Sequence, residues 1–385
     1  MLTLRNILHS GLSRRLITWF LILSLIPLTI TGGIGYSISR RAMRDAVFEE
    51  LRGIASGRRE AIRVLEEVRL QQVVEIATRP SVLEELSLAS PAMTKSLSVE
   101  LQRIQSVIKG FTKLYVFDAE GVVVASTEED LIGRNFADRD EFQLAKKEPR
   151  VDPTIHLDES GREVFDMSAP AFDPNTGEFL GVVTGEVSTR RLNQITTLRE
   201  GLGDTGEVYI VDYDQYMITE SRFVEDAPLN QKVDTFGVRE ALEGREGVDT
   251  YTDYRGHSVV GAYLRMPEYN WILLAEMDER EAFTAVRNLT WALVGIFIIS
   301  GLVVTVVAAW LSQVLARPIL SLRDVAARLA EGDLTQEIDL RTKDEVEELA
   351  RTMQEVIVAW REIMGDLNDE AMRLSTTAAE LAASS

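Results

Sequence analysis

Cysteine is absent from the 385-residue chain, and histidine is scarce. Without thiols the chain has no disulfide, no thiolate metal site and no cysteine nucleophile. Only three histidines occur, His9, His156 and His257, which argues against a multi-histidine metal site. We therefore expect neither a metal ion nor a cofactor.

Basic residues are also in deficit, with 41 Lys and Arg against 61 Asp and Glu, a net charge of −20. A surface this acidic repels phosphate, so nucleic acid is excluded as a partner. A kinase histidine box, a glycine-rich ATP loop and a cyclase signature are all missing, so we expect no enzyme activity. The acidic loop 173–178 lacks the full ligand series of a calcium site and is predicted to be a hairpin turn.

Two long stretches contain no charged residue. They are Leu16–Ser39, with 24 residues, and Asn288–Ala316, with 29, and each exceeds the ~20 residues that span a bilayer as a helix. A cleaved signal peptide is the alternative for the first stretch, but the stretch is too long and no small-residue cleavage site precedes Arg40. We predict membrane helices at 16–39 and 288–312.

The flanking charges predict an orientation. Arg14 and Arg15 precede the first span and Arg317 follows the second, which places the tail 1–15 and the C-terminal segment in the cytoplasm. Arg40 and Arg41 oppose this rule, but long translocated segments escape it. The segment 40–287 has 30 basic and 46 acidic residues, and we expect it outside the cell.

The outer segment is predicted to begin with a helix and to continue as a repeat. Apolar residues at helical spacing predict one long helix over 41–79, which Pro80 ends. From Phe111 the period changes to two, and a strand–turn–strand pattern at Leu114–Ser126 recurs at Val208–Thr219.

A short helical stretch and two more strands follow each hairpin. The strands are predicted at 164–171 and 179–187 in the first copy, and at 258–265 and 271–277 in the second. We predict two PAS-like modules of the α+β class, at about 92–196 and 203–282, each an antiparallel sheet with helices on one side.

Several short motifs resemble extracytoplasmic double-Cache sensor domains. They are Asn135–Phe142, Gly181–Ser188, Gly206–Asp212, Gln231–Thr235 and Trp271–Glu276. The resemblance extends over 40–287 and implies that a small solute binds in the membrane-distal module.

Within that module the resemblance points to Arg139 as the group that grips a carboxylate. Glu141 and Phe142 stand where amino-acid-binding relatives carry Trp-Tyr, and Glu186 replaces an aspartate. The alternative for Arg139 is a surface ion pair with Asp138 or Asp140.

The candidate ligand-binding residues are Arg139, Phe142, Phe165, Met167 and Glu186. Phe165 and Met167 alternate on one predicted strand, and burial in the core is the alternative for both. The expected ligand is a carboxylate or a zwitterion.

The segment after the second span resembles a HAMP domain over 313–365. Pro318 is expected to end the membrane helix and start a new one, and a heptad seam runs from Val346 to Leu367. The candidate relay residues are Pro318, Leu322, Gly332, Leu334, Glu345, Leu349 and Met353. A parallel homodimer would complete the four-helix bundle.

The tail 366–385 resembles the start of the methyl-accepting chemotaxis signalling hairpin. The resemblance implies a chemoreceptor of the bacterial inner membrane that acts on a histidine kinase and an adaptor through an output domain beyond residue 385. The alternatives are a sensor histidine kinase or a cyclic-dinucleotide enzyme without its output domain. The HAMP seam argues against a third alternative, a solute-binding membrane protein that does not signal.

Overall fold

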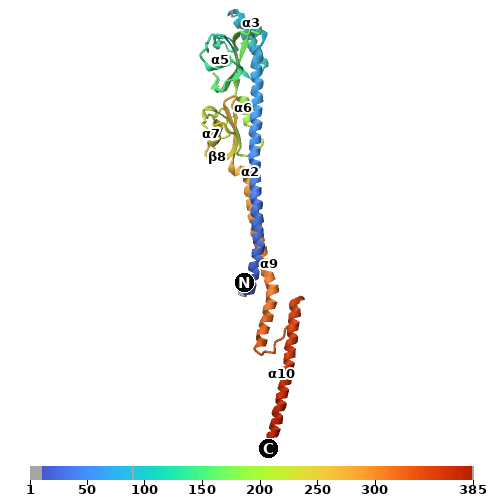
Figure 1. The fold of residues 1–385 in the computed structure, drawn as a ribbon. Coiled ribbons are helices and arrows are strands. Elements are labelled where there is room, and N and C mark those ends of the chain that lie inside the picture. Colours follow the sequence, from blue (N-terminus) through green and yellow to red (C-terminus); the bar gives the residue numbers. More distant parts are fainter. Residues whose placement is uncertain (1–10, 89–90, 384–385) are drawn as a thin grey trace. The chain divides into compact units, whose positions relative to one another are not determined.

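The computed structural model describes residues 11–88 and 91–383. These residues form two compact units, one within 39–288 and one of 11–38 with 289–383, and each is described by itself. Figure 1 gives the order of the elements along the chain. The architecture of antiparallel sheets, helices and two apolar helical segments confirms the predicted α+β class.

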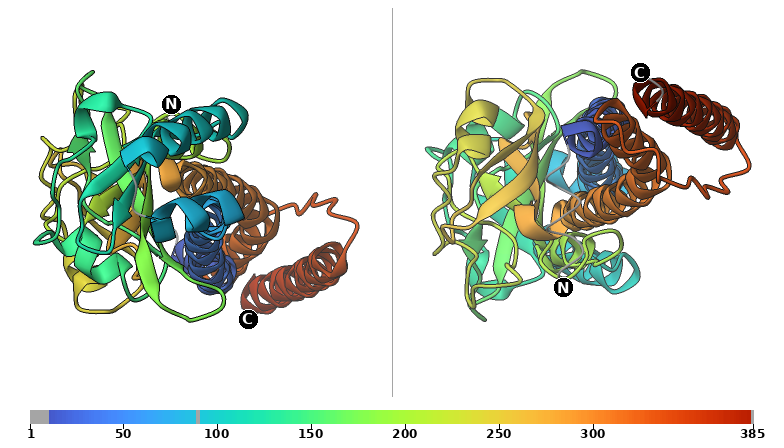
Figure 2. Two further views of the ribbon diagram at one scale, coloured as in Figure 1. Left: turned by 90° about the horizontal axis from the view of Figure 1, so that it is seen from above. Right: turned by 90° about the horizontal axis from the view of Figure 1, so that it is seen from below.

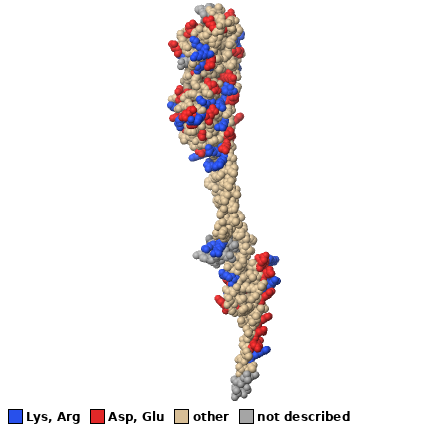
Figure 3. All heavy atoms as spheres, in the orientation of Figure 1, with Lys and Arg blue, Asp and Glu red and all other residues tan. Residues whose placement is uncertain are grey.

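Two helices are long and apolar enough to cross a membrane. Helix α2 (Gly11–Ala77) has 67 residues and contains Pro27, and helix α9 (Thr284–Ala330) has 47 residues. Their apolar parts show as surface without charged side chains in Figure 3. The predicted span at 16–39 and the predicted outer helix at 41–79 therefore belong to one unbroken helix.

The first module of the larger unit holds a six-stranded sheet with the order β2-β1-β6-β5-β3, and β4 pairs with β5. Helices α3 (Pro80–Leu88), α4 (Pro91–Val107) and α5 (Asp140–Ala145) belong to it. Its strands are β1 (Phe111–Asp118), β2 (Val123–Ser126), β3 (Arg150–Val151), β4 (His156–Leu157), β5 (Glu163–Phe172) and β6 (Phe179–Ser188). A short 3₁₀ turn, η1 (Glu129–Leu131), follows β2.

The second module holds a four-stranded sheet with the order β7-β10-β9-β8. Helix α6 (Arg190–Thr196) leads into it. Its elements are β7 (Glu207–Asp212), α7 (Phe236–Leu242), β8 (Gly247–Thr252), β9 (Ser258–Met266), β10 (Trp271–Asp278) and α8 (Glu279–Ala282). In both sheets the last strand of the module, β6 or β10, pairs with the first, β1 or β7, on one side.

Helix α2 covers one face of both sheets, and Figure 2 shows this layer from two ends. Alternation along the strands sends every second side chain to this face, where they form one core with Ile62, Val73 and Ile76 of α2. The two modules also touch there, because the rings of Phe165 and Trp271 meet edge to face at 5.5 Å. The opposite face of each sheet has its own cluster.

The smaller unit ends in two helices joined by an extended connector. Helix α9 continues through Pro318 to Ala330, so the prediction that Pro318 ends the membrane helix is wrong. Proline removes a single backbone donor, and the helical bonds on both sides carry the helix past it. Helix α10 (Glu345–Ala383) begins with acidic residues, as the helix dipole favours.

Candidate ligand-binding site

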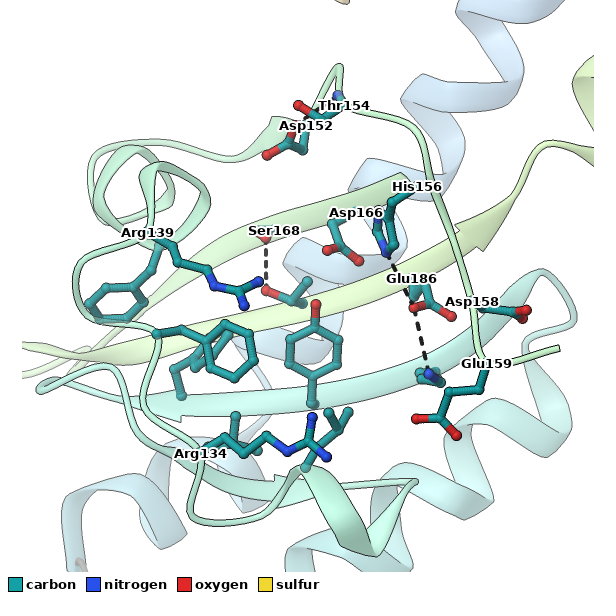
Figure 4. A pocket seen from close by; sticks show the side chains of 18 of the residues that line it. Arg134, Arg139, Asp152, Thr154, His156, Asp158, Glu159, Asp166, Ser168 and Glu186 are labelled. Atoms are coloured by element: carbon teal, nitrogen blue, oxygen red, sulfur yellow. Dashed lines mark hydrogen bonds and ion pairs between the residues drawn. The ribbon is translucent and has the colours of Figure 1, made fainter. Parts of the chain in front are cut away.

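A cavity of about 410 Å³ lies in the first module, on the sheet face turned away from α2 (Figure 4). Strands β1, β5 and β6 form its floor, and the segments 131–142 and 152–159 form its rim. The polar and charged residues that line it are Lys113, Tyr115, Arg134, Arg139, Asp152, Thr154, His156, Asp158, Glu159, Asp166, Ser168, Thr184 and Glu186.

One side of the cavity is cationic. Arg134 is held in place by Asp130, at 3.2 Å between Nη2 and Oδ2, and by the Asp130 carbonyl. The guanidinium of Arg139 lies 4.4 Å over the ring of Phe136 and reaches in Figure 4 toward the hydroxyl pair on the floor. The side chains of Asp140 and Glu141 lie outside the described residues, and none of the described carboxylates lies at ion-pair distance from Arg139. Arg139 thus presents its guanidinium to the cavity.

Glu186 occupies the other side and is ionised. Its carboxylate lies 3.8 Å from Lys113 Nζ and 3.7 Å from His156 Nε2, and it accepts a 2.6 Å hydrogen bond from the Thr112 hydroxyl. Burial opposes the charged form, but the neighbouring His156, the hydrogen bond from Thr112 and the charge of Lys113 together lower the pKa of Glu186. The neighbouring Glu186 carboxylate likewise raises the pKa of His156.

Asp166 lies beside Glu186 but in a different state. The two residues are cross-strand partners on β5 and β6, and Oδ1 of Asp166 is buried without a hydrogen-bond partner in the structure. Burial raises the pKa of Asp166 to about 7, and the charge of Glu186 adds to this, while His156 and the Tyr115 hydroxyl oppose it. An unpaired buried carboxylate oxygen is a costly arrangement that a ligand donor would relieve.

Hydroxyl groups lie between the two charged sides. Ser168 Oγ and Thr184 Oγ1 are 2.8 Å apart and buried on the floor. The cavity can therefore bind the anionic end of a small solute at Arg139, hydrogen-bond its middle, and bind a cationic end at Asp166.

Three of the five predicted ligand-binding residues line this cavity: Arg139, Phe142 and Glu186. The Glu141 side chain lies outside the described residues. Phe165 and Met167 are fully buried in the core on the α2 side, which is the alternative that the sequence left open.

Sequence reasoning missed Asp166 and Ser168. They alternate with Phe165 and Met167 on β5, so they occupy the opposite face of the same strand. The polar residues that alternate with the apolar ones along this strand could have indicated the face that lines the cavity. Nothing in the described residues gathers three His, Asp or Glu side chains in a metal-binding group.

The predicted relay residues lie on α9, α10 and the connector between them. Pro318 and Leu322 are on α9, and Leu322 is buried. Gly332 has a φ of +90°, which favours glycine, and the Leu334 carbonyl accepts a hydrogen bond from Arg361. Glu345 begins α10, Leu349 is exposed and Met353 is half-buried.

The Cache domain family matches residues 39–286, which is more than half of the chain. The chain belongs to the Cache-domain family. The HAMP domain family matches residues 310–357. This match begins slightly before the expected range of 313–365 and ends before its C-terminal end. This Cache-domain protein is a bacterial transmembrane sensor, and its two matched domains are sensory and signal-relay domains rather than catalytic ones.

Among curated proteins this Cache-domain sensor is similar to the sensor protein kinase WalK of Staphylococcus haemolyticus, with 21% identity over 184 residues. The match covers 44% of the chain and 29% of that relative. Among solved structures it is similar to the sensor domain of the histidine kinase DctB of V. cholerae, at 16% identity and a TM-score of 0.47 over 61% of this chain and 98% of the other. The sensory domain of the Campylobacter jejuni chemoreceptor Tlp3 with isoleucine bound gives 13% identity and a TM-score of 0.48 over 64% and 98%.

Proposed function

We propose that this Cache–HAMP sensor is a chemoreceptor-type transducer that detects a small zwitterionic solute in its first module. The observation that carries the proposal is the two-signed cavity, with the guanidinium of Arg139 on one side and the unpaired Asp166 oxygen on the other. A solute with a carboxylate and an ammonium group satisfies both, whereas a plain carboxylate leaves Asp166 unpaired.

The remaining parts of the proposal concern the surroundings of the chain. The Cache unit lies outside the inner membrane, α2 and α9 each span it, and the HAMP segment lies inside as a parallel homodimer. Solute binding would change the packing of the first module on α2, and the HAMP helices would switch between two packings. A histidine kinase and an adaptor would receive the signal.

A thermal-shift screen of the full chain in nanodiscs tests the binding site. The panel contains free amino acids, simple carboxylates such as acetate and succinate, and amines such as putrescine. We expect stabilisation by members of the first group only, because a single charge satisfies one side of the cavity.

Arg139→Ala should abolish the stabilisation, and Arg190→Ala, an exposed arginine of α6 away from the cavity, should leave it unchanged. Equal binding by Arg139→Ala and the unmodified chain would show that the cavity is not the ligand site.

A sensor histidine kinase is the second candidate, and the similarity to a sensor protein kinase favours it. The two functions differ in which protein becomes phosphorylated. When the product of the whole gene is incubated with ATP, a kinase phosphorylates its own histidine, whereas a chemoreceptor changes the activity of a separate kinase bound through an adaptor.

A further inference from the structure

Two glutamates of the second module face each other in the protein interior. Glu207 on β7 is the cross-strand partner of Glu276 on β10, and the side chains are 4% and 1% exposed. They share the sheet face that is turned away from α2, with Tyr209 and Leu274. Two ionised carboxylates placed directly opposite each other repel, and burial strengthens the repulsion.

Hydroxyl groups rather than cations surround the pair. Glu207 accepts hydrogen bonds from Tyr254, at 2.6 Å, from Ser221 and from a backbone N–H. Glu276 accepts one from Tyr251, at 2.8 Å, and its second oxygen is buried without a hydrogen-bond partner in the structure.

Strand β9 leaves room for this arrangement, because the residue opposite Glu276 is Gly261. A Cβ at Gly261 would lie 2.2 Å from the Tyr251 hydroxyl, so a side chain there would displace the tyrosine that bonds Glu276.

The other charged groups on the elements packed around the two glutamates bond to partners outside the pair. Arg255, the cation that acts on Glu207, bonds Asp253 at 2.6 Å and Asp278 at 3.1 Å. Arg222 bonds the Gly206 carbonyl at 2.9 Å. Asp249 of β8 pairs with Tyr263 of β9, and Arg239 and Glu240 of α7 pair with Asp234 and Arg245. Tyr209 of β7 also faces the two glutamates.

In the first module, a cation balances the negative charge of the carboxylates at the equivalent positions of the sheet. There Lys113 on β1 is the cross-strand partner of Glu186 on β6, which is partnered on its other side by Asp166 on β5. By strand order, Glu207 takes the place of Lys113, and Glu276 that of Glu186. Where the first module has a lysine, the second module has another acid.

We propose that the second module is an additional sensory site whose ligand is the proton: the Glu207–Glu276 pair holds one proton at neutral pH and releases it in alkaline medium. Burial raises the pKa of Glu276 to about 8, and the neighbouring Glu207 adds to this while Tyr251 opposes it. Burial also raises the pKa of Glu207, against the hydrogen bond from Tyr254.

The position of Glu276 on β10 connects its loss of a proton to the elements that follow in the chain. Strand β10 ends at Asp278, and α8 and then α9 follow directly in sequence. Loss of the proton leaves like charges opposite each other on β7 and on β10, which is the last strand before α9. We expect this strand to loosen from β7, and the proposal stands independently of any solute in the first module.

Difference infrared spectroscopy of the full chain in nanodiscs, titrated from about pH 6 to about pH 10, tests the proton. We expect a carboxylic-acid C=O band that disappears with a midpoint near the middle of this range, at about pH 8. Glu276→Gln should remove the band, whereas Asp166→Asn should remove only a band that titrates nearer neutrality.

Glu207→Lys copies the Lys113–Glu186 pairing into the second module. It should ionise Glu276 at every pH of the titration and abolish the alkaline step. Retention of the step in both Glu276→Gln and Glu207→Lys would overturn the proposal.

Hydrogen exchange of residues 271–282, corrected for the intrinsic pH dependence of exchange, tests the consequence. In the unmodified chain this segment should exchange severalfold faster above the midpoint than below it, and in Glu276→Gln the corrected rate should not change. Equal behaviour of the two proteins would show that the proton does not act on this strand.

Discussion

At the scale of single residues, Asp166 and Glu186 show how neighbouring carboxylates acquire different charges. They are cross-strand partners, but Glu186 accepts a hydrogen bond from Thr112 and lies 3.7 Å from His156, whereas one oxygen of Asp166 accepts no hydrogen bond. Burial raises the pKa of Asp166 to about 7 against the opposing effects of His156 and the Tyr115 hydroxyl, whereas the better compensated Glu186 stays ionised. The cavity therefore changes its charge close to neutral pH.

Solute binding should depend on this titration. If a ligand ammonium pairs with Asp166, only the ionised carboxylate binds it well, so binding must release a proton wherever Asp166 is protonated in the free protein. We expect the affinity for a zwitterion to fall about tenfold per pH unit below about pH 7 and to level off above it. The neighbouring Glu186 raises the pKa of His156, and the loss of the His156 proton acts in the same direction because it makes the cavity more negative.

Calorimetry in buffers of different ionisation enthalpy measures the released proton directly. Asp166→Asn should bind more weakly at pH 8 and lose most of the pH dependence. A steep pH dependence that survives in this variant would assign the proton to another group.

At the scale of elements, α10 has two different faces. One face packs on the connector: Ala350 and Ile357 are buried, and Gln354 accepts a 2.9 Å hydrogen bond from the Ile338 N–H. The other face is the heptad seam, which is largely open within one chain. Its exposed members are Leu349, Val356, Trp360, Ile363 and Leu367, each 42–58% exposed.

Burying such side chains contributes about 1.5–3 kcal/mol each, so the seam favours a second helix against it. With cysteine at Met353 in an otherwise cysteine-free chain, we expect rapid disulfide crosslinking between subunits in membranes. Cysteine at Glu355, which is exposed two positions away and off the seam, is the matched control and should crosslink slowly. Preferential crosslinking at Glu355 would place the dimer contact on another face.

The elements also show how much of the fold and of the site sequence patterns can predict. Period-two alternation located β5 and β6 to within a residue or two, because register along a strand repeats in the sequence. It did not say which face of β5 lines the cavity, since both faces carry buried residues and only the three-dimensional position of α2 separates them. Arg139 could be found from its motif, whereas the Glu207–Glu276 pair depends on strand pairing between distant segments.

At the scale of the whole molecule, two candidate membrane helices separate the Cache unit in sequence from the two terminal segments. If both helices cross the bilayer, residues 40–287 lie on one side and the two terminal segments on the other. The arginines before the first span and after the second favour a cytoplasmic location for the termini.

Single cysteines test this arrangement. With a membrane-impermeant maleimide on intact spheroplasts, we expect labelling of Asn175→Cys, in the exposed turn between β5 and β6, because this turn belongs to the outer segment. Glu355→Cys should be labelled only after lysis. The reverse pattern would invert the orientation, and labelling of both in intact cells would exclude two membrane crossings.

Trp271 gives the sensor a built-in optical reporter. It is the one tryptophan between the two apolar stretches of the sequence, and it is completely buried. Its indole N–H donates a 3.3 Å hydrogen bond to the carbonyl of Pro153, which lies between two residues of the cavity rim, Asp152 and Thr154. The same ring belongs to β10, the strand that carries Glu276. In a chain whose other four tryptophans are replaced by phenylalanine, the emission of Trp271 can therefore register events at the solute cavity and at the carboxylate pair without any added dye.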